Sequence, residues 1–149
     1  MRILIVSRTP WNVSNSFGNT FSNLFVGMDD VEIYHICCKH GATKGSPAKA
    51  TFQMSDLSVM HSILRRRGGV GWSVDSQDNC ADNAAVSKSA EKNRRPFALY
   101  VRDLIWTLGA WKNDAALRAF LDEAKPDVLY LPLYSSCYMC DVQQYVVDA

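Results

Sequence analysis

A long polar loop near the amino terminus carries the side chains best suited to binding a ligand. Ser7 to Thr20 is rich in hydroxyls and amides and contains a single glycine, Gly18. The loop leads into a helical pattern, and the amino end of a helix favours anions such as phosphate. Gly18 would let a ligand approach the backbone closely, and Trp11 offers a flat ring for a sugar or base to stack on. We predict a binding loop; the competing interpretation is a capped loop with Trp11 packed on the domain.

This loop does not match the known nucleotide-binding motifs. The three closely spaced glycines of a dinucleotide-binding turn are missing, and the Gly-Lys-Ser/Thr pattern of a P-loop does not occur. We therefore predict that this chain binds no cofactor of its own.

Two of the five cysteines form a Cys-x-x-Cys pair, Cys137 and Cys140. A redox role would require a thioredoxin-like context, and a zinc site would require a second pair of ligands. Only Cys37 and Cys38, with a neighbouring histidine, could supply that pair, and adjacent cysteines rarely give tetrahedral geometry. We predict free thiols and no metal site, with the redox and metal alternatives left open.

One histidine is a candidate general base. His40 falls near the carboxyl end of a predicted strand, where catalytic groups gather in parallel sheets. His35 lies inside that strand and is predicted to be structural, whereas His61 is predicted to face solvent from a helix.

A basic cluster and an apolar helix suggest a second surface. Arg65 to Arg67 lie close before Trp72, and they form either a solvated helix end or a contact with an anionic membrane surface or a phosphate-bearing acceptor. The apolar helical pattern over residues 97–111 is more simply explained as core than as a membrane anchor.

These side chains need a scaffold, and the hydrophobic pattern predicts one. Residues 2–7 are a continuous apolar run, typical of a strand buried on both faces of a parallel sheet. Apolar residues then recur at helical spacing over 17–28, and residues 31–37 predict a second strand. The first 37 residues therefore predict one βαβ unit with a right-handed crossover.

The remaining pattern predicts an α/β, Rossmann-like, doubly wound fold with a mainly parallel sheet and helices on both faces, a three-layer α/β/α arrangement. Ligands in such sheets bind beyond the carboxyl ends of the strands, where the strand order reverses. The loops 7–18 and 132–138 should therefore matter most, followed by 37–41. The other predicted elements are a strand at 50–53, helices at 55–66, 96–111 and 114–125, a strand at 127–131, a helix from residue 137, and a loop or weak helix within 73–95.

Bulk composition narrows the class of protein. The chain has 149 residues, 48% of them hydrophobic and 21% charged, and a formal net charge of +1. This length suits one domain, and the weak charge argues against a nucleic-acid binder. No apolar run approaches the roughly 20 residues that span a bilayer, and the first residues lack the pattern of a signal peptide. We expect a cytoplasmic protein.

Three stretches resemble a known family. They are residues 1–12 with Phe17–Thr20 and the strand at 31–37, then Arg102–Trp106, and finally Ala124–Pro132. Together they are similar to the N-terminal domain of bacterial GT-B-fold retaining glycosyltransferases, of the family 4 type, that act in polysaccharide biosynthesis. The resemblance covers most of the chain outside residues 40–95.

The resemblance implies that residues 1–149 are the acceptor-binding half of an enzyme that moves a sugar from a nucleotide-sugar to an acceptor hydroxyl, in cell-surface polysaccharide or glycolipid synthesis. The nucleotide-sugar would be held by a C-terminal domain beyond the given sequence, so this segment alone should be inactive. The acceptor would be a sugar or a lipid-linked sugar, with possible peripheral contact at the inner membrane surface.

The resemblance also implies which residues face each substrate. The donor phosphates and sugar would face the loop Asn15, Ser16, Phe17, Gly18 and Asn19. Acceptor contacts would come from Trp11, Tyr134, Ser135 and Ser136. The alternative is a stand-alone, flavodoxin-like module that binds a nucleotide or another small ligand.

Overall fold

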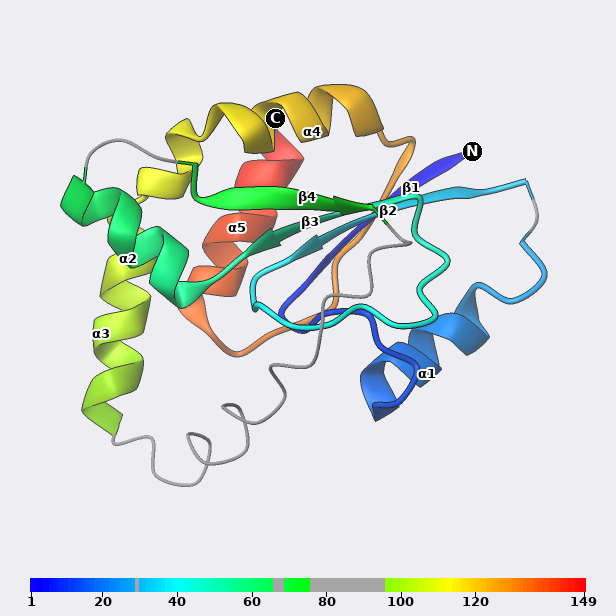
Figure 1. Cartoon of the computed structure of the whole chain (residues 1–149), viewed down its shortest axis with the longest axis horizontal. Helices are drawn as coiled ribbons and strands as arrows, with labels where there is room; N and C mark the ends of the chain where they lie inside the picture. Colours follow the sequence, from blue (N-terminus) through cyan, green and yellow to red (C-terminus); the bar gives the residue numbers. More distant parts are fainter. Residues whose placement is uncertain (29, 66–68, 76–95) are drawn as a thin grey trace.

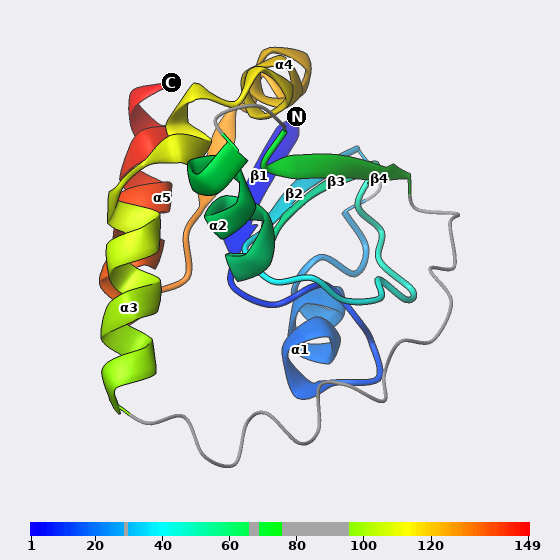
Figure 2. The same ribbon diagram turned by 60° about the vertical axis from the view of Figure 1, so that its left-hand side comes forward.

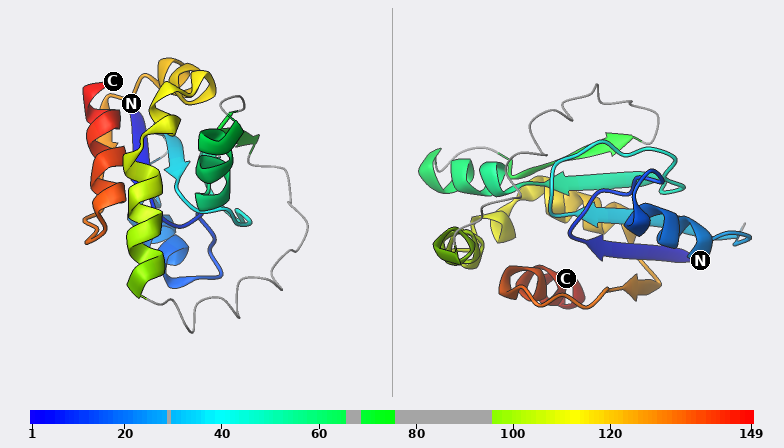
Figure 3. Two further views of the ribbon diagram at one scale, coloured as in Figure 1. Left: turned by 90° about the vertical axis from the view of Figure 1, so that its left-hand side faces the viewer. Right: turned by 90° about the horizontal axis from the view of Figure 1, so that it is seen from below.

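The computed structural model describes residues 1–28, 30–65, 69–75 and 96–149. Its described strands form one sheet in the order β4-β3-β2-β1-β5 (Figure 1). The strands are β1 (Arg2–Ser7), β2 (Glu32–Cys37), β3 (Ala50–Met54), β4 (Gly71–Asp75) and β5 (Val128–Tyr130). Four of them are parallel, and β4 runs antiparallel to β3, as the right-hand view of Figure 3 shows.

Helix α1 (Ser16–Leu24) covers one face of this sheet. Phe21 of the helix packs with Ile3 and Ile5 of β1 and with Ile33 of β2, and Trp11 lies in the same buried cluster. These residues alternate along their strands with others that face the opposite layer, as the period of two in a strand requires.

The other described helices pack on the opposite face or at its edge. They are α2 (Asp56–Arg65), α3 (Pro96–Thr107), the 3-10 helix η1 (Ala110–Asn113), α4 (Ala115–Ala124) and α5 (Cys137–Asp148). Their core includes Trp106, Trp111 and Tyr138 packed over Leu4 and Val6 of β1. Figure 2 shows α3 and α5 side by side, apart from α1. The predicted Rossmann-like, mainly parallel sheet with helices on both faces is therefore confirmed.

The sequence pattern did not predict β4. Residues from 73 onward are polar and were expected to form a loop or weak helix, yet Gly71–Asp75 pairs with β3. Gly71 permits this pairing because a Cβ there would lie 2.2 Å from the ring of Phe52. Strand formation here depends on a partner distant in sequence, which a local pattern cannot reveal. The predicted helix around 81–92 lies outside the described residues.

Helix α1 is shorter than its apolar pattern predicted. It ends at Leu24, where Phe25 forms the C-cap, and Leu24 and Met28 are exposed rather than inward. Leu57 of α2 is also exposed, whereas Val59 is buried. In each case the tertiary packing shows which side of a helical stripe meets the sheet.

Helix α3 corrects a further expectation. Its apolar residues were predicted to be core, but Tyr100 and Leu104 are 75% and 60% exposed, as is Leu108 just beyond the helix at 63%, and only Trp106 among the described side chains of this helix is buried. The charged pair on this helix is the more protected part, since the side chains of Arg102 and Asp103 are 11% and 27% exposed and bind each other at 2.8 Å. None of the helices in the described part of the chain is long and apolar enough to cross a membrane.

Candidate functional site

The strand order reverses between β1 and β5. From β1 the chain moves outward to β2 and β3 with α1 on one face, and it returns to β5 with the helices on the other face. The loops that leave β1 and β5 therefore diverge to opposite sides of the sheet, and we call the space between them at the carboxyl edge the crevice, since ligands of open α/β sheets bind at such a switch point. This is the position that the sequence predicted for a ligand site.

The two diverging loops contact each other at their bases. The backbone N–H of Arg8, directly after β1, donates a hydrogen bond of 3.1 Å to the hydroxyl of Tyr134, in the loop after β5. Burial raises the pKa of Tyr134 above its ordinary value, so this phenol stays protonated and can itself donate to a ligand. Its neighbour Ser135 is exposed.

Trp11 does not lie in this crevice. Its ring is wholly buried beneath α1, in a T-shaped contact of 5.3 Å with Phe21, and its indole N–H donates to Ser22 Oγ at 3.0 Å. The expectation that Trp11 offers a stacking face to the acceptor is therefore wrong, and the competing interpretation of a ring packed on the domain is correct. The polar loop around it serves to bring this ring inward.

Gly18 is needed by the chain itself. A Cβ at this position would lie 2.1 Å from the backbone oxygen of Asn12, so the close approach is made by Asn12 and not by a ligand. The side chain of Asn15 is likewise occupied, because its Oδ1 accepts from Gly18 N at 2.7 Å and caps α1. These two residues shape the loop; a contact with donor phosphate stays a prediction for them.

The rest of the predicted donor-facing loop is divided between core and surface. Phe17 packs against Phe21 with ring centroids 4.1 Å apart. Ser16 and Asn19 are exposed at the start of α1. They are the members of this loop that remain open to a partner.

His40 follows β2 at the same carboxyl edge. Its ring lies 5.4 Å from that of Trp72 on β4, and it lines a small cavity of about 180 Å³ whose wall is made by Cys38, Lys39, His40, Ser55, Asp56 and Leu57. The imidazole is exposed and close to both a cation and a carboxylate, which leaves its role as a general base a prediction.

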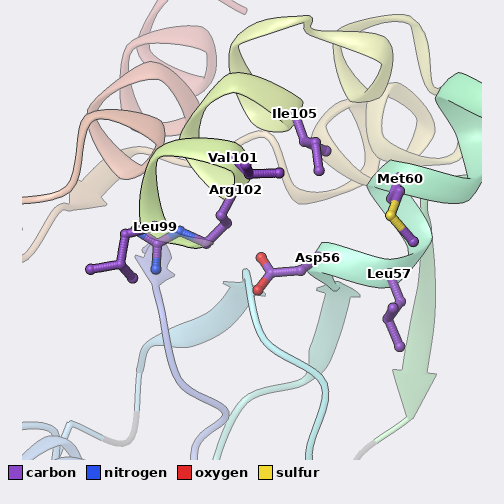
Figure 4. Close-up of a pocket in the computed structure, with 7 residues that line it drawn as sticks. All are labelled: Asp56, Leu57, Met60, Leu99, Val101, Arg102 and Ile105. Carbon is purple, nitrogen blue, oxygen red and sulfur yellow. The ribbon is translucent and has the colours of Figure 1, made fainter. Parts of the chain in front are cut away.

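A second, more apolar groove adjoins that cavity. It lies between α2 and α3, has a volume of about 250 Å³, and is lined by Asp56, Leu57, Met60, Leu99, Val101, Arg102 and Ile105 (Figure 4). Asp56 and Leu57 line both hollows, so the two are neighbours. Asp56 is held in place by the Trp106 indole, which donates to its Oδ1 at 2.9 Å.

Two arginines converge at this edge from distant parts of the sequence. The guanidinium of Arg102 lies over the ring of Tyr138, 4.5 Å from its centroid. Burial raises the pKa of Tyr138, and the charges of Arg8 and Arg102 both act against that rise. A guanidinium matches the oxygens of a phosphate, and two together suit a diphosphate.

These residues were not singled out from the sequence. Asp56 was considered only as a helix cap, and Arg102 only as part of a helix similar to one in a family. No local signal joins Arg8, Asp56, Arg102 and Tyr138, because they lie on four separate segments that meet only when the sheet forms. The loop positions after β1 and β5 were the one part that topology allowed us to predict.

His35 and Ser7 form a buried pair beneath the site. Ser7 Oγ donates to Thr9 O at 2.8 Å and lies 2.7 Å from His35 Nε2, so the ring nitrogen is the donor of that contact. Burial lowers the pKa of His35 to about 3, and its Nδ1 has no hydrogen-bond partner. His35 is therefore a neutral core residue, as predicted, and His61 is exposed, also as predicted.

The described residues contain no group of three or more His, Cys, Asp or Glu side chains able to hold a metal ion. Among them, Cys37 and Cys38 are buried, whereas Cys137 and Cys140 are exposed, and all four are free. The geometry of the carboxyl edge is thus suited to holding an anionic group beside an apolar groove.

Comparisons of the chain with models of protein families, with curated proteins and with solved structures found no match.

Proposed function

We propose that this chain is the acceptor-binding half of a glycosyltransferase that moves a sugar from a nucleotide-sugar to an acceptor hydroxyl, in cell-surface polysaccharide or glycolipid synthesis. The observation that carries the proposal is the reversal of strand order between β1 and β5, whose exit loops are joined by the bond from Arg8 N to Tyr134 Oη at 3.1 Å. The three sequence stretches that resemble such enzymes form or flank this part of the fold. In this proposal a second domain holds the nucleotide-sugar across the crevice.

The chemistry of the edge favours a lipid-linked acceptor. Arg8, directly after β1, would contact its phosphate groups, and the groove between α2 and α3 would receive the first apolar units of its lipid. The loop with half-buried Tyr134 and exposed Ser135 lies next to Arg8 and would contact the acceptor sugar. His40 is the candidate for accepting the acceptor's hydroxyl proton.

A titration tests this assignment. Purified protein is titrated calorimetrically with geranyl diphosphate, a short mimic of a lipid-linked diphosphate. We expect Arg8→Gln to weaken binding by roughly 10-fold or more, since hydrogen bonds to charged groups contribute about 1.5–3 kcal/mol. Arg118→Gln, on α4 outside the site, is the matched control and should bind as the unchanged protein does. Equal losses in the two variants would contradict the proposed site.

A second test concerns the proposal that the nucleotide-sugar is held by another domain. Incubated with a nucleotide-sugar and a lipid-linked acceptor, residues 1–149 should transfer no sugar, because the donor groups belong to the second domain. Measurable transfer by this chain alone would overturn that part of the proposal.

The outward apolar face of α3 supports a peripheral contact with a membrane. Tyr100, Leu104 and Leu108 point to solvent while the charges of the helix are paired and partly buried, and the arginine cluster at 65–67 follows α2 in the sequence. In vesicle co-sedimentation with anionic phospholipid, Leu104→Gln should reduce binding several-fold. Val147→Gln, an equally apolar exposed position on α5, should not. Binding that is unchanged in Leu104→Gln would contradict this contact.

The flavodoxin-like alternative is not favoured by the topology. A flavodoxin-like sheet has the strand order 2-1-3-4-5, with the first strand between the second and third. Here β1 lies between β2 and β5, and β3 lies outside β2. The observed order is the one found in one half of a dinucleotide-binding or GT-B-like sheet.

A further inference from the structure

The first turn of α5 contains two exposed thiols. Cys137 is the first residue of the helix and Cys140 stands three positions later, and both are solvent-exposed while Cys37 and Cys38 are buried. Residues three apart on a helix face the same side, with Cβ atoms about 5–6 Å apart. A disulfide needs a Cβ separation of about 3.5–4.5 Å, so a small tightening of this turn brings the two sulfurs together.

The turn is poorly tied down at its start. Ser136 is the N-cap of α5, yet its side chain makes no capping hydrogen bond and its Oγ is a buried atom without a partner. The Ser136 side chain therefore leaves the first backbone N–H groups of the helix uncapped beside Cys137. The first turn is closed by backbone bonds to Ser136 O from Met139 N and Cys140 N, at 3.1 and 3.4 Å.

The thiols are linked to the crevice through Tyr134. The Sγ–H of Cys140 donates to the carbonyl oxygen of Tyr134 at 3.8 Å, and the hydroxyl of the same tyrosine accepts from Arg8 N. A disulfide has no S–H, so oxidation of Cys140 removes the first of these bonds. We expect the loss of this bond to weaken the hydrogen bond from Arg8 N to the Tyr134 hydroxyl, which joins the loops after β1 and β5.

We propose that Cys137 and Cys140 are a reversible dithiol–disulfide site that exchanges with small-molecule disulfides such as glutathione disulfide and that controls the Tyr134 loop. The Cys137 thiolate attacks one sulfur of the small disulfide, whose S–S bond breaks and releases one thiolate. The Cys140 thiolate then attacks Cys137 Sγ and releases the second. Two protein thiols are oxidised, one small disulfide is reduced to two thiols, and the two protons end on the released sulfurs.

Thiol–disulfide exchange is a reaction separate from sugar transfer, so its test needs no glycosyltransferase assay. The test uses protein with the substitution Cys80→Ser, because Cys80 is the one cysteine of the sequence besides Cys37, Cys38, Cys137 and Cys140. This protein is equilibrated in mixtures of reduced and oxidised glutathione. It is then quenched in acid and mapped by peptide mass spectrometry. We expect an intramolecular Cys137–Cys140 link in oxidising mixtures, fully reversed in reducing ones. One glutathione on each thiol, or a link between molecules, would overturn the proposal.

Two single variants define the order of attack. In Cys140→Ser the reaction should stop at a glutathione adduct on Cys137, whereas Cys137→Ser should form its adduct on Cys140 several-fold more slowly. Both positions are exposed, so serine is tolerated by the fold. Equal rates in the two variants would overturn the assignment of Cys137 as the attacking thiol.

The coupling to the crevice is measured on the Arg8 amide. In the oxidised protein this N–H should exchange with solvent roughly 5- to 10-fold faster by NMR, since losing a typical hydrogen bond costs about 1 kcal/mol. The Cys140→Ser variant kept in reducing buffer, which can still donate a hydrogen bond to Tyr134, should show the slow exchange. Identical exchange in the oxidised and reduced proteins would overturn the control of the Tyr134 loop.

Discussion

Gly18 lies in the first turn of α1, and its Cα faces the backbone of Asn12. We predict that Gly18→Ala lowers the free energy of unfolding by about 1–3 kcal/mol, because the added methyl group would lie 2.1 Å from Asn12 O and force one of two backbones to move. Urea denaturation followed by tryptophan fluorescence measures the change. Gly69→Ala is the control, since a Cβ there finds its nearest atom at an ordinary 3.5 Å. A Gly18 variant as stable as the Gly69 variant would contradict the packing role.

His35 makes stability depend on pH. Its pKa is lowered to about 3 in the folded chain, from 6.5 when unperturbed, because burial disfavours the charged ring. Between these values the unfolded chain binds a proton that the folded chain does not, so stability falls as pH falls from about 6.5 toward 3. The slope contributed approaches about 1.4 kcal/mol per pH unit.

Denaturant titrations from pH 7 to pH 4 measure this slope for the unchanged protein and for His35→Gln. In His35→Gln, the free energy of unfolding should depend less steeply on pH, by the contribution of the one proton that His35 binds when unfolded. His61→Gln, which removes an exposed histidine, should keep it. A slope that is the same in all three proteins would show that His35 is not buried in its neutral form.

At the scale of elements, Asp114 joins α4 to β4. Its Oδ1 caps α4 through Ala116 N at 2.9 Å, and its Oδ2 accepts from Val70 N and Gly71 N at 2.6 and 3.1 Å at the start of β4. The carboxylate is itself buried. The antiparallel edge strand is therefore anchored to a helix that follows it by some 40 residues in sequence, and the sequence predicted only the capping half of this role.

We predict that Asp114→Ala destabilises the protein by about 2–4 kcal/mol, because it removes the α4 cap and leaves two backbone donors of β4 without their acceptor. Thermal unfolding by circular dichroism provides the measurement. Asp122→Ala, at an exposed position of the same helix, should change stability by less than about 0.5 kcal/mol. Equal shifts would mean that the contact with β4 contributes little.

Across the whole molecule, the sheet should be most stable at its centre. Strands β1 and β2 are each paired on both sides and buried against helices or core on both faces, whereas β5 is a short edge strand paired only with β1 in the described structure. We predict that the amides of Leu4 to Val6 exchange only through global unfolding, and that those of β5 exchange at least 10-fold faster. Native-state hydrogen exchange followed by NMR tests this. Equal protection would indicate that the edge of β5 is covered in solution.

Local sequence correctly predicted whether a segment forms a helix or a strand where its hydrophobic pattern agrees with the burial of its side chains in the structure. The helices α1 and α4 close their backbone hydrogen bonds within their own segments, and the apolar runs of β1 and β5 are distinctive enough to be recognised before their partner strands are known. The βαβ unit and the Rossmann-like class could be predicted from that order alone. The loops after β1 and β5 could be placed at one edge for the same reason.

Only the tertiary structure decided which side chains meet there. The ring of Trp11 packs inward against Phe21 of α1. The leucines of α3 face outward because Trp106 and Arg102, on its inner side, contact Asp56 and Tyr138. Strand β4 formed because β3 offered an open edge. Alternation and helical period limit which residues can share a face, but the choice between faces depends on contacts such as Trp106 with Asp56, 50 residues apart, and those exist only once the chain has folded.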